Sequence, residues 1–90
     1  MAYTLGILKT RSFEEWKEGF EAPENVAWRK EAGGGAARIF RVEDEPNTVV
    51  VLIEWESLER AKKHAESAKL REIHSDLLLA PPQFYYLEAA

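Results

Sequence analysis

The sequence predicts an α+β protein of the ferredoxin-like type, in which a four-stranded antiparallel sheet carries two helices on one face. Three observations lead to this prediction. Strand-like and helix-like segments follow one another in the order βαββαβ, an acidic turn joins the two middle strands, and 90 residues are about the length of one domain. Right-handed crossovers would place the first and third strands in the middle of the sheet. We expect residues 1–90 to form this single ferredoxin-like domain.

The first strand is predicted over residues 3–9, where apolar side chains recur at every second position. A helix follows, because Ser12 and Glu15 form a capping box in which each side chain reaches the backbone amide of the other. The apolar stripe of this helix has the spacing i, i+3, i+7 and consists of Phe13, Trp16 and Phe20.

Two features are expected to interrupt and then end this helical region. Pro23 removes one backbone amide and disfavours helical geometry at Ala22, so the helix should kink or restart before Trp28. The three glycines at residues 33–35 supply a left-handed C-cap and a turn. They lack the spacing and the preceding strand of a phosphate-binding loop.

A hairpin is predicted from strands at residues 36–43 and 48–55, with the turn-forming residues 44–47 as its tip. The second strand contains the most apolar stretch of the chain, residues 49–53. Because this stretch has no polar alternation, we expect the strand to be central in the sheet and covered on both faces.

The second helical region is expected in two pieces, with Ser57 and Ser67 as their N-caps. Each piece carries apolar residues at i, i+3, i+7. Pro81 and Pro82 stop helix propagation, and the aromatic segment 83–88 predicts the last strand.

The hairpin also predicts which residues face one another across the sheet. A tip centred near Glu45 and Pro46 pairs residues whose numbers sum to about 92, so Arg38 would lie opposite Glu54. Both sheet faces are apolar, but the helices cover only one. We therefore expect a homodimer in which the open sheet face packs on its copy.

Composition narrows the classes of partner. The chain has 12 Lys and Arg against 16 Asp and Glu, a net charge of −4 that disfavours nucleic acid. It has no cysteine, which removes disulfides and thiolate metal sites, and its two histidines lack a metal-binding spacing. No apolar run is long enough to cross a membrane, and the N-terminus lacks a signal-peptide pattern. We expect a cytoplasmic protein with no metal, nucleic-acid or membrane partner.

Short strings along most of the chain carry a family resemblance, at residues 12–17, 38–41, 44–47, 49–55, 65–67 and 82–88. Together they resemble the dimeric α/β-barrel superfamily, and within it small stand-alone proteins similar to antibiotic biosynthesis monooxygenases, often labelled cyclase-like. The resemblance spans residues 3–88 and implies a ferredoxin-like fold that closes into a dimeric α/β barrel. It does not choose a reaction, because the superfamily includes quinone-forming monooxygenases, haem-degrading enzymes, isomerases, dehalogenases and proteins of no known activity.

An oxygenase of this kind that uses no cofactor needs an aromatic-walled, water-poor pocket that holds a phenol and favours its anion. We predict Trp16, Trp55 and Tyr85 as ligand-binding wall residues, with core packing as the competing interpretation. Arg38 and His74 are the candidate catalytic polar groups. No acid–base pair of carboxylates is identifiable from the sequence.

Two of these candidates have alternative roles. The predicted pair of Arg38 and Glu54 is either an ion pair that fixes the strand register or a polar anchor for an anionic or phenolic ligand. His74 could instead cap its helix or serve as the axial ligand of a haem. His64 is expected to be exposed, because Lys62, Lys63 and Glu66 surround it in the sequence.

These residues leave three hypotheses about function. The first is a cofactor-independent monooxygenase or cyclase acting on an aromatic, polyketide-like molecule between helices and sheet. The alternative is a non-catalytic dimer that binds a small ligand or has a structural role. Haem binding and degradation ranks third.

Overall fold

The computed structural model describes residues 1–90, and its elements follow the predicted order. They are β1 (Ala2–Lys9), α1 (Phe13–Glu21), α2 (Pro23–Glu31), β2 (Gly34–Val42), β3 (Glu45–Trp55), α3 (Leu58–Ala65), α4 (Ala68–Leu77) and β4 (Gln83–Glu88). Both helical regions are therefore divided, as the sequence predicts. None of the helices is long and apolar enough to cross a membrane.

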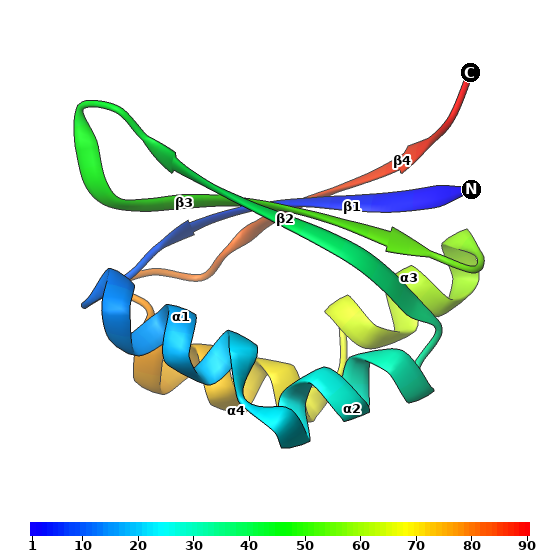
Figure 1. Cartoon of the computed structure of the whole chain (residues 1–90), viewed down its shortest axis with the longest axis horizontal. Helices are drawn as coiled ribbons and strands as arrows, with labels where there is room; N and C mark the ends of the chain where they lie inside the picture. The colour runs from blue at the N-terminus through cyan, green and yellow to red at the C-terminus, as the bar shows by residue number, and fades with distance from the viewer.

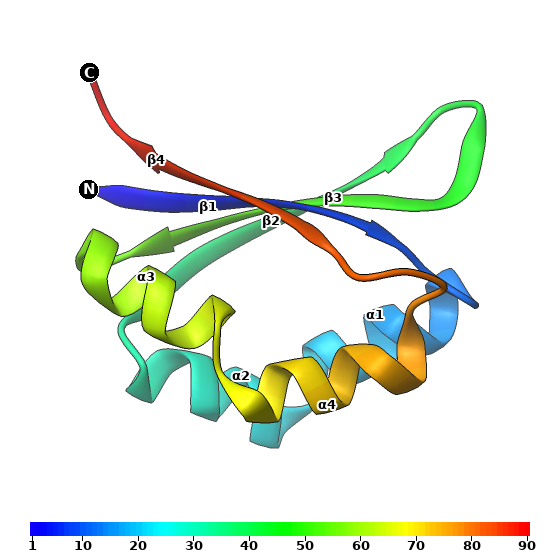
Figure 2. The ribbon, with the colours of Figure 1, turned by 180° about the vertical axis from the view of Figure 1, so that it is seen from behind.

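One antiparallel sheet has the strand order β2-β3-β1-β4, which confirms that β1 and β3 are central. All four helices lie on the same side of this sheet (Figure 1), and the view from behind shows α3 and α4 below β1 and β4 (Figure 2). The other side of the sheet carries no helix. The predicted ferredoxin-like fold is confirmed.

Local signals explain where the helices begin and end. The hydroxyls of Ser12, Ser57 and Ser67 each accept a hydrogen bond from the backbone amide three residues later, at 3.2 to 3.3 Å. Pro23 occupies the first turn of α2, where its missing amide costs nothing, and the extended backbone of Ala22 separates α1 from α2. Gly33 follows α2 with a φ of 98°, the left-handed geometry that glycine adopts without strain.

The predicted hairpin is present, but the strand register predicted for it is wrong. The turn comprises residues 43–44, so β3 begins at Glu45 and the tip lies earlier than predicted. Arg38 therefore pairs with Leu52 rather than with Glu54, and Glu54 pairs with Tyr3 of β1. The two-residue turn pairs Val42 with Glu45, so their numbers sum to 87. The irregularity next to Arg41 brings this sum back to 90 for residues 37–41 of β2, two less than predicted, and a second irregularity precedes Ala37. Because the shift at Arg38 is even, the assignment of residues to sheet faces still holds.

The inner face of the sheet builds the core with the helices. On β1 and β3 the buried residues alternate, and Trp16 of α1 and Ala61 of α3 pack against them. Gly6 belongs to this face, and a Cβ there would lie 3.0 Å from the ring of Phe84 on β4. The glycine therefore lets Phe84 lie close to the sheet. The buried strand residues of the core cluster are Ala2, Leu8, Val49, Val51, Ile53 and Trp55.

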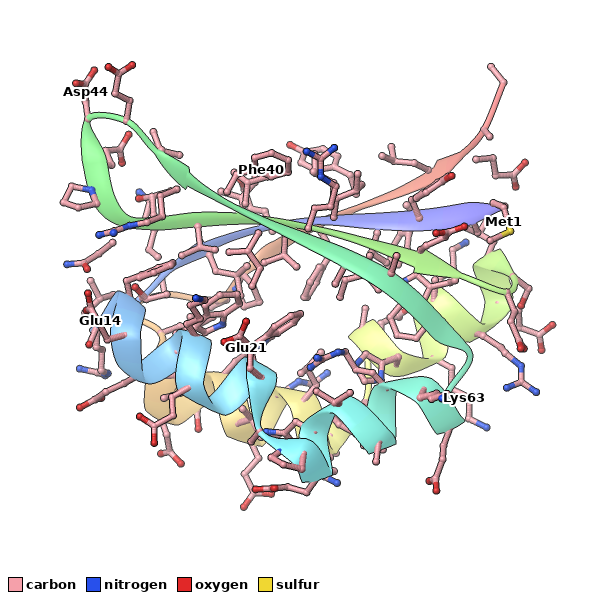
Figure 3. The ribbon with its side chains drawn as sticks, viewed as in Figure 1. Met1, Glu14, Glu21, Phe40, Asp44 and Lys63 are labelled. Carbon is pink, nitrogen blue, oxygen red and sulfur yellow. The ribbon has the colours of Figure 1, made fainter.

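We call the opposite side of the sheet the outer face. It is apolar and uncovered in the single chain, with Phe40 43% exposed, Tyr85 51% and Leu87 40%. Figure 3 shows Phe40 pointing away from the helices. The outer face comprises Tyr3, Leu5, Ile7, Arg38, Phe40, Val50, Leu52, Glu54, Tyr85 and Leu87. The predicted covering of β3 on both faces is thus met on the inner side only.

Candidate functional site

A cavity lies between the inner face of the sheet and the helices. It has a free volume of about 70 Å³ and is lined by 18 residues, of which 12 are hydrophobic. The lining includes all three tryptophans, together with Phe20 and Phe84. Its ionisable side chains are Arg29, His64 and His74, and no carboxylate lines it. The cavity therefore suits an aromatic ligand and disfavours a positive charge.

His64 on α3 is the most unusual of these side chains. It is only 6% exposed, and its ring centroid lies 4.4 Å from that of Trp28 and 4.8 Å from that of Trp55. Its Nδ1 is the one buried side-chain nitrogen or oxygen without a hydrogen-bond partner. Such an atom is costly unless a ligand or a water satisfies it.

The predicted exposure of His64 is wrong, and helix geometry explains why. Lys62, Lys63 and Glu66 are exposed, whereas position 64 is one turn from Ala61, which is fully buried. Burial, followed by electrostatic repulsion from Arg29, His74 and Lys69, lowers the pKa of His64 to about 4. The imidazole is therefore neutral at physiological pH.

Trp55 forms the part of the wall nearest the sheet. It is 1% exposed, and its Nε1–H donates a 2.9 Å hydrogen bond to the Oγ1 of Thr4 on β1. This bond satisfies the only polar atom of the indole inside the core and fixes the plane of the ring. The sheet thereby holds Trp55 in place against His64.

Arg29 provides the cation of the cavity. Its guanidinium lies 3.7 Å from the centroid of the Phe20 ring, and its Nη2 donates a 2.8 Å hydrogen bond to the Phe20 carbonyl. The Nδ2 of Asn25 donates to the carbonyl of Gly19 at 2.7 Å. These two bonds hold α2 against the end of α1 across the break at Pro23. Burial lowers the pKa of Arg29, so its charge is partly desolvated beside the cavity.

His74 on α4 also lines the cavity. Its ring stacks on Phe84 of β4 with centroids 6.1 Å apart, and burial lowers its pKa to about 4. The cavity therefore contains two neutral imidazoles at physiological pH. No group of three histidine or acidic side chains is placed to hold a metal ion.

The fold closely matches solved structures. A monooxygenase of Streptomyces coelicolor, solved with the ligand nanaomycin D, matches at a TM-score of 0.77 with 20% identity, over 99% of this chain and 87% of its own. A proposed antibiotic biosynthesis monooxygenase from Nitrosomonas europaea matches at 0.71 with 19% identity, over 99% and 98%. Another from Bordetella bronchiseptica matches at 0.73 with 15% identity, over 99% and 96%. The chain has the antibiotic biosynthesis monooxygenase-like fold. The sequence matches no family model, and no curated protein is significantly similar to it.

This fold is the one that the resemblance inferred from the sequence implies. The predicted site residues fall into two groups within it. His74, Trp16 and Trp55 line the cavity. The structure does not bring Arg38, Glu54 and Tyr85 to it, because they lie on the outer face. Arg38 is exposed, with its guanidinium 5.1 Å from the Phe40 ring centroid.

Three further side chains of the cavity were not predicted as site residues from the sequence: Trp28, Arg29 and His64. A signal existed for His64, since it is three residues after Ala61 in the apolar stripe of its helix. Arg29 had none, because its neighbours in sequence do not reveal its contact with Phe20 across the helix break.

Proposed function

We propose that this protein binds a hydroxylated aromatic molecule in the cavity and oxygenates it with O₂, without a cofactor. The observation that carries the proposal is the unpartnered Nδ1 of His64, which is buried between two indole rings. Aromatic rings favour a flat, apolar ligand, and a hydroxyl group would satisfy the imidazole nitrogen.

The charges around the cavity favour the anion of such a ligand. Arg29 and Lys69 lower the pKa of His64 because they disfavour a further positive charge. For the same reason they would lower the pKa of a bound phenol, since they stabilise a negative charge. An anion beside His64 would in turn raise the pKa of the imidazole, so that His64 could hold the proton that the ligand loses.

The reaction we propose converts a ring CH₂ of an anthrone-type substrate into a carbonyl. Loss of one proton gives a delocalised anion, which reduces O₂ and forms a hydroperoxide at that carbon once the proton returns. The hydroperoxide then loses water and leaves the C=O group. One oxygen atom enters the product, the other leaves as water with both hydrogens, and no further reductant is needed. The similarity to a monooxygenase solved with nanaomycin D supports an aromatic polyketide-like substrate.

An oxygen electrode tests the activity. With an anthrone as substrate, we expect the protein to accelerate O₂ uptake, with about one O₂ consumed per quinone formed, the quinone being followed by its absorbance. His64→Phe keeps an aromatic ring and removes the nitrogen, so the rate should fall by about 100-fold, the usual effect of losing a general base. A rate equal to that of buffer alone would refute the oxygenase assignment.

Two other functions are distinguished by the same samples. Anthrone binding without O₂ uptake would favour the non-catalytic ligand-binding protein. Haem binding would give a Soret band on titration, with His64 or His74 as the available imidazole ligand. We place haem below an anthrone because a macrocycle is the larger of the two molecules and would require the greater expansion of a cavity with a free volume of about 70 Å³.

We also propose that two copies of the chain pack through their outer faces. An uncovered apolar sheet face of this kind is typical of an interface, and a closed dimer buries it on both copies. Phe40, Tyr85 and Leu87 are at least 40% exposed in the single chain, although they are large and apolar. The assembly would be a barrel made of two sheets, with one cavity in each chain.

Light scattering tests the dimer. The wild-type protein should have twice the 10.3 kDa mass of the chain, and a Phe40→Glu, Leu87→Glu double variant should have the mass of one chain, because four charges would face each other across the interface. Val26→Glu is the matched control, since Val26 is 44% exposed on α2, away from the sheet. A monomeric wild-type protein, or a dimer that survives the double change, would contradict this assembly.

A further inference from the structure

A groove at one edge of the molecule adjoins the cavity. This groove has a free volume of about 610 Å³ and lies where α4 leads through Pro81 and Pro82 into β4. Figure 2 shows this connection passing close to the end of β1. Ala65, His74 and Phe84 line both the cavity and the groove, so these side chains lie between the two spaces. A ligand seated in the cavity would therefore have its open end toward the groove.

The groove carries a net positive charge in a chain whose net charge is −4. Arg11, between β1 and α1, and Arg71 on α4 are both exposed and both line it. Neither arginine has a carboxylate within 4 Å. The ion pairs of the chain involve other residues and join Lys17 to Glu21 and Arg60 to Glu56. The two guanidiniums are thus free to bind an anion.

The other ionisable side chains of the groove set the size of that charge. Glu66 is the only carboxylate in the lining, and its negative charge contributes to the raised pKa of Tyr86 on β4, after burial. His74 is neutral at physiological pH, as shown above. Two arginines and one glutamate leave one positive charge. A singly charged carboxylate neutralises this charge, whereas a doubly charged phosphate would leave one negative charge uncompensated beside Glu66.

We infer that the aromatic ligand of the cavity carries a carboxylate on a short chain, and that Arg11 and Arg71 bind this carboxylate in the groove. This inference rests on the proposed function, because it assigns a second group to the molecule that occupies the same cavity. The ring enters the cavity first, passes His74 and Phe84, and leaves its charged end between the two arginines. The groove therefore selects acidic aromatic substrates over neutral ones.

Paired ligands test the inference without requiring turnover. One probe is a naphthol with a three-carbon carboxylic acid side chain, and the other is the corresponding carboxamide. All three tryptophans line the cavity, so quenching of their fluorescence reports binding of either probe. At low salt the acid should bind about 10-fold more tightly than the amide, as a charge-assisted pair predicts, and the difference should shrink as salt is added.

Variants then locate the preference. Arg11→Gln combined with Arg71→Gln should abolish it and leave the affinity for the carboxamide unchanged, while Glu66→Gln should increase it. Arg60→Gln removes one positive charge outside the groove and should leave the preference intact. Equal affinities for acid and amide in the wild type, or a preference that survives the double substitution, would overturn the inference and leave the proposed function standing. If neither probe quenches the fluorescence, the proposed function fails and this inference fails with it.

Discussion

Trp55→Ala should lower the free energy of unfolding by about 3 to 5 kcal/mol, the range for truncating a buried tryptophan. Trp55 is 1% exposed and is the largest fully buried side chain of the core. Its removal leaves a void beside His64 and deprives the Thr4 hydroxyl of its donor. Urea unfolding followed by far-ultraviolet circular dichroism measures the change, because the remaining tryptophans do not then affect the signal.

A second variant separates packing from hydrogen bonding at this position. Trp55→Phe retains most of the ring volume and removes the Nε1–H, so its cost should be about 1 to 2 kcal/mol. Trp28→Ala is the comparison for a partly exposed wall residue and should cost less than Trp55→Ala. A loss under 1 kcal/mol for Trp55→Ala would remove Trp55 from both the core and the cavity wall.

Acidification should have an effect of similar size. Between pH 7 and pH 4.5 we expect the two histidines to cost about 2 to 4 kcal/mol of stability. Their pKa falls from an ordinary value of 6.5 to about 4 in the folded protein. Below pH 6.5 the unfolded chain therefore binds protons that the folded chain does not, so stability is complete above this value and is lost as the pH falls toward 4.

The histidine contribution can be isolated by substitution. A His64→Phe, His74→Phe variant has no imidazole to titrate, so the slope of unfolding free energy against pH over this interval should be much smaller than in the wild type. Carboxylates titrate in both proteins and cancel in the comparison. Identical slopes would show that neither imidazole is desolvated in the folded state.

The sequence was informative wherever the signal is local. Serine caps, the break at Pro23 and the apolar run of β3 predict their elements because each acts through backbone geometry within a few residues. The hairpin register failed because it depends on a two-residue turn, which Pro46 and Asn47 in the sequence did not indicate. The face assignment survived because it needs only the parity of the register.

Only part of the candidate site was predicted, because the sequence places a side chain on a face of its element but does not show what that face contacts. Trp16 and Trp55 lie on the apolar faces of their elements, so periodicity is sufficient to place them. Arg38 and Tyr85 required knowledge of which sheet face meets the helices, and strand alternation is symmetrical in this respect. His64 was predicted to be exposed because its neighbours in the sequence are charged, although its spacing from Ala61 places it on the buried side of α3.

The proposed binding depends on His64 accepting a hydrogen bond from a ligand hydroxyl, and one titration measures this bond. Tryptophan fluorescence gives the affinities of wild type and His64→Phe for 1-naphthol and for 1-methoxynaphthalene, which cannot donate. The wild type should prefer the naphthol by about 10-fold, the value of one net hydrogen bond, and His64→Phe should bind both compounds equally. An undiminished naphthol preference in His64→Phe would show that His64 does not accept this hydrogen bond.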